Sequence, residues 1–477
     1  MTDFSKLRAA MHNLGCKVNS YEAESMLNEL REAGAEIVPW DTEADIYIIN
    51  TCSVTNIADR KSRQMLHRAR AQNPDAIVVG TGCYVQARAE ELRKDLSVDI
   101  LIGNNRKSRI VPAIRDFLQA REAARASGEG EDNACGGRTA DSLVPVIREE
   151  KEYEEMARGA VSEKVRAFLK IQDGCSQFCS YCIIPLVRGR IRSRREEDAL
   201  AEIRQLAGMG YHEIVLTGIH LSSYGMDFEA QSYEYAMNRE IPSDHLLGLI
   251  EAAAQTTGIT RIRLGSLEPR IITEQFVRRL RAIPEICPHF HLSLQSGCDR
   301  TLRAMNRHYD TAAFRESVRL IRAAWPDAAI TTDVIVGFPG ETEEDFRESF
   351  RFIEETGFYE LHVFKYSRRQ GTAADRMPGQ LTDREKTRRS AELLRLDERA
   401  SAAFRERFLF REDTILPEEV LTEGGQQYLC GFNREYVKFY VPVEDPASSV
   451  SKIGEEMRVR AVKNCATYLL ASACEIV

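Results

Sequence analysis

The sequence predicts an α/β protein made of three successive regions: an open parallel sheet with helices on its faces, a partial barrel of six strand–helix units, and a small antiparallel β-barrel. Short apolar runs alternate with helical stretches from residue 8 to about residue 119. The same alternation resumes after residue 160, and period-2 alternation replaces it after about residue 406. Strands that alternate with helices indicate a parallel sheet, and period-2 patterns indicate antiparallel strands.

Length and composition are those of a globular protein. The 477 residues, 43% hydrophobic and 29% charged, suffice for two to four domains. No apolar run approaches the roughly 18 residues that span a bilayer, and the N-terminal MTDFSKLRAA has no apolar segment of the kind found in signal peptides. We therefore expect a cytoplasmic protein without membrane contact. In a reducing compartment its 12 cysteines favour metal binding or catalysis over disulfides.

The first region contains the apolar runs RAAMHNL, DIYIIN and AIVVG, separated by helical stretches such as SYEAESMLNELREAG. We place this domain at residues 4–119. Residues 120–160 are rich in Gly and acidic residues, as in REEKEYEEMARG, and we expect a solvated linker.

The second region, residues 161–405, contains six candidate strands, at 165–172, 213–217, 260–265, 289–294, 329–336 and 359–366. Six consecutive strand–helix units predict a partial barrel. Residues 225–243 interrupt the rhythm and are expected to form a surface insertion. A long charged helix near 381–407 precedes residues 406–477, where QQYLCGF and EYVKFYVPV predict a small barrel of the OB-like kind.

Three cysteines, Cys175, Cys179 and Cys182, follow the first strand of the second region directly. Active sites of barrels of this kind lie at the carboxyl ends of the strands. A 4Fe–4S cluster has four irons, so three thiolates leave one iron open to chelate a small molecule such as S-adenosylmethionine. A structural zinc site would need a fourth Cys or His, and none lies nearby.

Three further cysteines, Cys16, Cys52 and Cys83, each follow a predicted parallel strand of the first region. Carboxyl ends of parallel strands meet at one edge of the sheet, where open α/β sheets bind ligands. This placement predicts a second site with three thiolates. The remaining six cysteines are assigned no function, and His220 and His291 are expected to be packed or hydrogen-bonded histidines rather than metal ligands.

These motifs resemble those of the methylthiotransferases of the radical S-adenosylmethionine superfamily over nearly the whole chain. NLGCKVNSYEAE, NTCSVTNIADRKSRQ, GTGCYVQ and GCSQFCSYCIIPLVRGRIRSR are similar to the cysteine motifs of the family in their order. LGSLEP, HLSLQSGCDRTLRAMNR and DVIVGFPGETEEDF are similar to its later barrel motifs. CKVN at the first cysteine is most similar to the MtaB type, which modifies N6-threonylcarbamoyladenosine beside the tRNA anticodon. Ser20 stands where that type commonly has Gln.

The resemblance implies a radical SAM barrel and a C-terminal TRAM barrel. It implies that Cys175, Cys179 and Cys182 hold a radical-generating 4Fe–4S cluster and that Cys16, Cys52 and Cys83 hold an auxiliary 4Fe–4S cluster that delivers sulfur. The implied reaction uses two molecules of S-adenosylmethionine: one yields the radical that takes hydrogen from C2 of the adenine, and one supplies the methyl group. The cofactors carry the difficult steps. Implied partners are the tRNA anticodon loop and an external electron donor such as flavodoxin; we expect a monomer.

Several polar residues at predicted strand ends are candidate contacts to cofactor or substrate. Thr217 and Gly218 end the second barrel strand, where the superfamily contacts the methionine part of the cofactor. Glu268 and Gln295 follow the third and fourth strands, and Tyr181 precedes the last cysteine of the triplet. The alternative at Thr217 and Gly218 is a tight strand–helix turn. For Glu268 and Gln295 it is a hydrogen bond at a helix start or within a loop.

Three basic runs near strand ends predict a rim that contacts RNA phosphates. They are Arg188, Arg190, Arg192, Arg194 and Arg195; Arg60, Lys61, Arg63, Arg68 and Arg70; and Arg368 and Arg369. The net charge of −8 opposes this expectation, so RNA binding would depend on local patches.

Alternatives to this function are modification of isopentenyladenosine in tRNA, modification of a ribosomal protein side chain, and a non-catalytic iron–sulfur scaffold. The first two share the chemistry and differ in substrate. Formation of 5′-deoxyadenosine would separate an enzyme from a scaffold.

Overall fold

The computed structural model describes residues 4–126, 141–156, 165–228, 241–443 and 451–474. The chain forms two compact units. The first contains residues 1–161, 170–195 and 367–375, and the second contains residues 162–169, 196–366 and 376–477. The segment that carries the cysteine triplet therefore belongs to the first unit, together with the N-terminal sheet.

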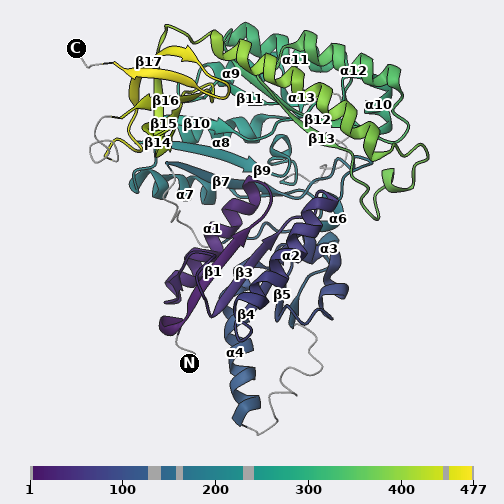
Figure 1. The fold of residues 1–477 in the computed structure, drawn as a ribbon, viewed down its shortest axis with the longest axis vertical. Helices are drawn as coiled ribbons and strands as arrows, with labels where there is room; N and C mark the ends of the chain where they lie inside the picture. The colour runs from purple at the N-terminus through teal and green to yellow at the C-terminus, as the bar shows by residue number, and fades with distance from the viewer. Residues whose placement is uncertain (1–3, 127–140, 157–164, 229–240, 444–450, 475–477) are drawn as a thin grey trace. The chain divides into compact units, whose positions relative to one another are not determined.

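The first unit is built on a six-stranded parallel sheet in the order β2-β1-β3-β4-β5-β6. Figure 1 labels its strands β1, β3, β4 and β5. Every residue of β3 and β4 is buried, as expected for parallel strands covered on both faces. The strands are β1 (Arg8–Asn13), β2 (Glu36–Ile37), β3 (Ile46–Thr51), β4 (Ile77–Gly82), β5 (Ile100–Ile102) and β6 (Asp141–Leu143), and the helices are α1 (Lys17–Glu32), α2 (Asn56–Gln72), α3 (Cys83–Leu92) and α4 (Ile110–Ala126).

The acidic stretch is not a solvated linker where the structure describes it. Strand β6 extends the sheet by pairing with β5. Glu154 accepts hydrogen bonds from the backbone and the hydroxyl of Ser108, and Glu150 forms an ion pair with Arg106 at 2.7 Å. Met156 is buried in the core of the sheet. The acidic composition misled the prediction because these carboxylates have partners that are distant in sequence.

The second unit contains the barrel strands, and the predicted positions of all six are confirmed. One sheet has the order β10-β9-β7-β8 and the other has the order β11-β12-β13. The strands are β7 (Arg166–Asp173), β8 (Arg192–Ser193), β9 (Glu213–Gly218), β10 (Arg261–Leu264), β11 (His289–His291), β12 (Ala329–Val336) and β13 (Glu360–Lys365). The end of β7 and the whole of β8 belong to the first unit. The helices are α7 (Glu196–Gly208), α8 (Asp244–Ala254), α9 (Glu274–Arg281), α10 (Asp299–Ala304), α11 (Thr311–Ala324), α12 (Glu343–Thr356) and α13 (Asp383–Glu406).

The C-terminal part of the second unit is a closed barrel in the order β14-β15-β16-β18-β17, which confirms the third predicted region. Its neighbouring strands are antiparallel, as predicted, except β16 and β18, which pair in parallel. Its strands are β14 (Glu412–Glu423), β15 (Gln426–Phe432), β16 (Lys438–Pro442), β17 (Met457–Asn464) and β18 (Leu469–Ala473). Buried Arg263 of β10 joins it to the larger barrel, because its guanidinium donates to Glu213 at 2.8 Å and to the carbonyl oxygen of Arg434 at 2.9 Å.

The domain boundaries 4–119, 161–405 and 406–477 remain a prediction. The insertion predicted at 225–243 overlaps residues 229–240, which lie outside the described residues. Within the described part of the chain, no helix is both long and apolar enough to cross a membrane.

Candidate metal centres and active site

The three cysteines of the first region lie at one edge of the parallel sheet. Cys16 is the N-cap of α1 after β1, Cys52 follows β3, and Cys83 begins α3 after β4. Strands β1, β3 and β4 are adjacent, so their carboxyl ends bring these residues together. The pKa of Cys52 is raised to about 12, mainly by burial and also by the neighbouring thiols of Cys83 and Cys16. The predicted convergence of the three thiols is therefore present.

Backbone geometry fixes the position of Cys83. Gly82 before it has φ +96°, and a Cβ there would lie 2.5 Å from the carbonyl oxygen of Thr51. Only glycine fits such a position without a shift of the backbone. The turn that positions Cys83 therefore requires glycine at residue 82.

The donors around these thiols suit a negatively charged group. The Asn104 amide lies 3.6 Å from the Cys83 sulfur and donates to the Val187 carbonyl oxygen at 2.7 Å, while its buried Oδ1 has no hydrogen-bond partner. The positive charges of Lys107 and Arg188 are fully buried nearby. A buried thiolate needs compensating positive charge, which a metal cluster supplies and these cations assist. The residues present fit a thiolate-ligated cluster.

The cysteine triplet occupies a tightly held loop of the same unit, between β7 and the short helix α6 (Ile184–Val187). Gly174 before Cys175 has φ +68°, and a Cβ there would lie 1.8 Å from the Arg190 carbonyl oxygen. The Cys175 backbone N–H donates to the Gly189 carbonyl oxygen at 3.0 Å, and that of Cys182 donates to the Cys179 carbonyl oxygen at 3.0 Å. This fixed loop has the donor set and the rigidity that a cluster with three thiolates requires.

The first basic run is not a phosphate-binding rim, and that prediction is wrong for three of its five arginines. Arg188, Arg192 and Arg194 have no exposed surface. Arg188 donates to Glu22 at 2.8 and 2.9 Å and to Asp173 at 3.0 Å, and Arg194 donates to Glu155. A buried cation persists only when it is paired, so these residues serve the interior of the first unit.

The buried ionic network of the first unit consists of Glu22, Asp173, Lys107, Lys170 and Arg188. Burial would raise the pKa of Glu22, but Arg188, Lys107 and Lys170 hold it well below its usual range. The Arg188 guanidinium also donates to the Asn19 side chain at 2.6 Å. The network therefore connects the helix that follows Cys16 to the strand that precedes Cys175.

Two other residues of the predicted rim form ion pairs within the protein. Arg369 is buried and donates to Asp59 at 2.6 Å, and Arg70 pairs with Asp99 at 2.5 Å. Exposed positions do remain. Arg190 and Arg195 are exposed, as is the basic face of α2, by which we mean Arg60, Lys61 and Arg63.

In the second unit, the predicted cofactor residues lie at strand ends. Thr217 and Gly218 end β9, Glu268 lies beyond β10, and Gln295 lies beyond β11 with φ +68°. Glu268 is fully engaged with the protein: it accepts from His220 at 2.9 Å and from Arg270 at 2.6 Å. His220 is therefore hydrogen-bonded, as the sequence predicted, and a cofactor contact by Glu268 stays a prediction.

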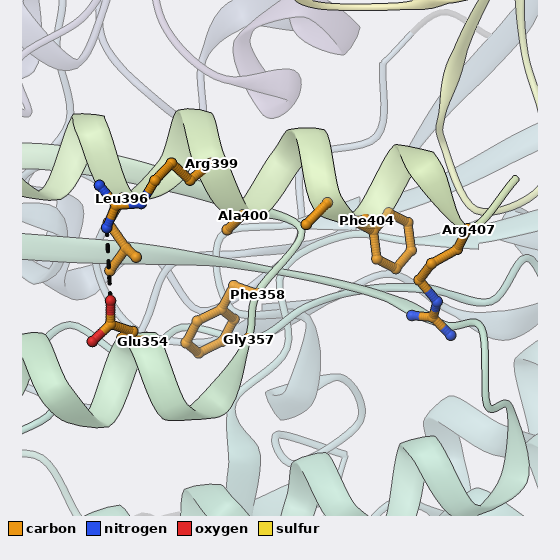
Figure 2. A pocket seen from close by; sticks show the side chains of 9 residues that line it. Glu354, Gly357, Phe358, Leu396, Arg399, Ala400, Phe404 and Arg407 are labelled. Carbon is orange, nitrogen blue, oxygen red and sulfur yellow. Dashed lines mark ion pairs between the residues drawn. The ribbon is translucent and has the colours of Figure 1, made fainter. Parts of the chain in front are cut away.

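Sequence reasoning missed one group of residues, His291, Asp333 and His362, which adjacent strands of the second unit bring together. No local spacing could have signalled it, because each residue comes from a different strand. A separate surface hollow of about 370 Å³ lies between α12 and α13, where Glu354 and Arg399 form an ion pair at 3.6 Å (Figure 2). None of the predicted site residues lines this hollow.

The structure thus has two groups of three cysteines, one at the edge of a parallel sheet and one in a loop after a barrel strand, and a partial barrel of six strands. Residues 8–103 match the uncharacterized protein family UPF0004, and residues 169–353 match the radical SAM superfamily. The structure resembles that of TsrM, a radical S-adenosylmethionine methyltransferase from Kitasatospora setae, with a TM-score of 0.51 at 15% identity over 77% of both chains, which concerns the fold alone.

Curated relatives are closer in sequence. The threonylcarbamoyladenosine tRNA methylthiotransferase MtaB of Bacillus subtilis is 37% identical over 93% of this chain and 92% of its own, and that of Aquifex aeolicus is 36% identical over 84% and 90%. The tRNA-2-methylthio-N(6)-dimethylallyladenosine synthase of Oceanobacillus iheyensis is 32% identical over 92% and 80%. The chain belongs to the methylthiotransferase family of radical SAM enzymes. Membership of the superfamily implies a 4Fe–4S cluster and S-adenosylmethionine.

Proposed function

We propose that this enzyme attaches a methylthio group to C2 of N6-threonylcarbamoyladenosine at position 37 of tRNA. The observation that carries the proposal is the presence, in one compact unit, of two sets of three cysteines, with a glycine turn directly before Cys83 in one set and before Cys175 in the other. Radical chemistry alone needs one such set; a second set provides a place for sulfur. The printed activities of the Bacillus and Aquifex relatives support the choice of nucleoside.

In this proposal each set of cysteines has its own task. Cys175, Cys179 and Cys182 hold the 4Fe–4S cluster that, when bound, supplies the electron for cleavage of S-adenosylmethionine and so the radical chemistry. Cys16, Cys52 and Cys83 hold an auxiliary 4Fe–4S cluster and present sulfur to the substrate. Asn104 donates toward the Cys83 sulfur, and buried Arg188 and Lys107 balance the negative charge of the thiolates.

The predicted strand-end residues complete the proposed site. Thr217 and Gly218, at the end of β9, would contact the methionine part of the cofactor. We also assign cofactor contacts to Tyr181, in the cysteine loop, and to Gln295, beyond β11. Glu268 acts through its neighbours, because His220 and Arg270 already occupy its carboxylate.

Substrate tRNA would approach through exposed cations. We assign phosphate contacts to the basic face of α2, with Arg190 and Arg195, because these side chains are exposed at the surface of the first unit. An anticodon loop offers unstacked bases that an active site can receive. The proposal includes a cytoplasmic enzyme, an external electron donor such as flavodoxin and a monomeric state.

The choice of substrate is tested by competition. The reconstituted enzyme receives dithionite, S-adenosylmethionine and an equal mixture of two tRNAs, one carrying threonylcarbamoyladenosine and one carrying isopentenyladenosine. Nucleoside mass spectrometry should detect the 2-methylthio product of the first and none of the second, and no product with Cys179→Ala. Product from isopentenyladenosine alone would contradict the proposed nucleoside, and 5′-deoxyadenosine without product from either would direct the search to another substrate.

A further inference from the structure

Three side chains of the second unit meet on one face of the sheet β11-β12-β13. His291 pairs in register with Thr331, and Asp333 pairs with His362 on the next strand. Residues two apart on a strand point to the same face, so Thr331 and Asp333 place both histidines on that face. The sequence alone predicts a hydrogen-bonded role for His291; the structure adds two partners from neighbouring strands.

Distances between the polar atoms are short. His291 Nε2 lies 3.2 Å from one oxygen of Asp333, and His362 Nδ1 lies 3.2 Å from the other. The two imidazole rings stack with centroids 5.2 Å apart, and one ligand atom from each of the three residues lies within 4.8 Å of the others. Metal–ligand bonds of about 2.0–2.2 Å in a tetrahedral site place neighbouring ligand atoms about 3.3–3.5 Å apart.

The surroundings prepare these atoms as ligands. Thr331 Oγ1 lies 2.9 Å from His291 Nδ1, which orients the ring so that Nε2 faces Asp333. A histidine that binds a metal through one nitrogen is commonly held at the other nitrogen in this way.

Access and charge also suit a cation. The side chains of His291, Asp333 and His362 are 10%, 27% and 51% exposed. The group is therefore nearly buried at His291 and accessible to solvent at His362. Glu360 and Asp397 lie near His362 and add carboxyl groups to its surroundings. Two imidazoles and one carboxylate, with a side left open, form the ligand set of many zinc and non-haem iron sites.

We propose that His291, Asp333 and His362 form a binding site for a divalent transition-metal ion of the zinc class, with a ligand set that includes no cysteine. His291 binds through Nε2, Asp333 through its carboxylate and His362 through Nδ1. A water molecule or a ligand oxygen completes the coordination on the open side. The proposal does not depend on which nucleoside the enzyme modifies.

Zinc is the probe for the test. The anaerobically reconstituted enzyme is dialysed to equilibrium against micromolar zinc, and mass spectrometry counts zinc and iron per chain. The wild type should hold one zinc more than His362→Ala and Asp333→Asn, with the same iron content in all three proteins. His67→Ala is the matched control, because His67 is 52% exposed and pairs with one carboxylate, Asp95, at 3.0 Å, without a third ligand. That variant should retain the zinc.

X-ray absorption at the zinc edge identifies the ligands. The proposal expects nitrogen and oxygen neighbours at about 2.0 Å and no sulfur at about 2.3 Å. Equal zinc content in all four proteins would overturn it and leave the three side chains as a hydrogen-bonded group. A sulfur shell would also overturn it, because zinc would then be bound to cysteines. Because His362 is half-exposed, its replacement by alanine should not unfold the protein, and a loss of zinc in that variant reports the loss of a ligand.

Discussion

Replacement of Arg188 by leucine should destabilise the first unit strongly. Its guanidinium is completely buried and donates to Glu22 at 2.8 and 2.9 Å and to Asp173 at 3.0 Å. Removal of one partner from a buried ion pair costs about 3–5 kcal/mol. Lys107 and Lys170 still contact Glu22 in the variant, so we expect the lower part of that range, about 3 kcal/mol.

Urea unfolding of the protein before cluster assembly measures this loss. The chain has two tryptophans, Trp40 in the first unit and Trp325 in the second, so Trp40 fluorescence in a Trp325→Phe background follows the first unit. With a slope of about 1–3 kcal/mol per molar urea, the midpoint should fall by roughly 1 M or more. Arg188→Lys keeps the charge but loses the two-pronged contact with Glu22, and should fall between wild type and leucine.

Arg68→Leu is the control. Arg68 and Asp41 form an ion pair at 2.8 Å in the same unit, but their side chains are 55% and 80% exposed. Exposed pairs contribute about 0–1 kcal/mol, so this variant should hardly move the midpoint. Equal shifts for Arg188→Leu and Arg68→Leu would refute the reasoning, since the buried network would then contribute no more than a surface pair.

Three further predictions concern a turn, a titrating group and RNA binding. Gly82→Ala should cost the enzyme about half of its iron, because Cys83 is displaced, whereas Gly210→Ala, with φ +90° but open space around its Cβ, should keep its iron. Burial, together with the charge of Asp413, raises the pKa of Glu435 to about 7 from an ordinary value of 4.5. The folded protein then holds a proton that the unfolded chain has lost, so stability should fall as pH rises from about 5 to about 7; thermal unfolding of Glu435→Gln should lack this part of the fall, and an unchanged pH profile would contradict the assignment. Reversing the charge of the basic face of α2 should weaken tRNA binding at least about tenfold and flatten its dependence on salt, and a loss of affinity with an unchanged salt slope would argue against phosphate contacts there.

The strands and the cysteines could be predicted from sequence because both depend on local pattern. Alternation of apolar runs placed the ends of β3, β4 and β12 within two residues, since buried strands of a parallel sheet are largely apolar. The position of a cysteine directly after such a strand then fixes where it lies in space. This is why the convergence of Cys16, Cys52 and Cys83 followed from the sequence.

Charged residues were predicted less well, because their environment depends on distant partners. Arg188 and Arg190 are two positions apart in one basic run, yet the first is buried against Glu22 and the second is exposed. Nothing in the run reveals that Glu22 will face it. The group at His291 was missed for the same reason, since its carboxylate comes from the neighbouring strand.

The central claim is that the two sets of cysteines perform different tasks in one reaction. The most direct test measures 5′-deoxyadenosine and 2-methylthio nucleoside together in Cys52→Ala and Cys179→Ala, with tRNA that carries threonylcarbamoyladenosine. Cys52→Ala should still form 5′-deoxyadenosine but no methylthio product, and Cys179→Ala should form neither. Methylthio product from Cys52→Ala at the wild-type level, or loss of 5′-deoxyadenosine in both variants alike, would contradict the division of tasks.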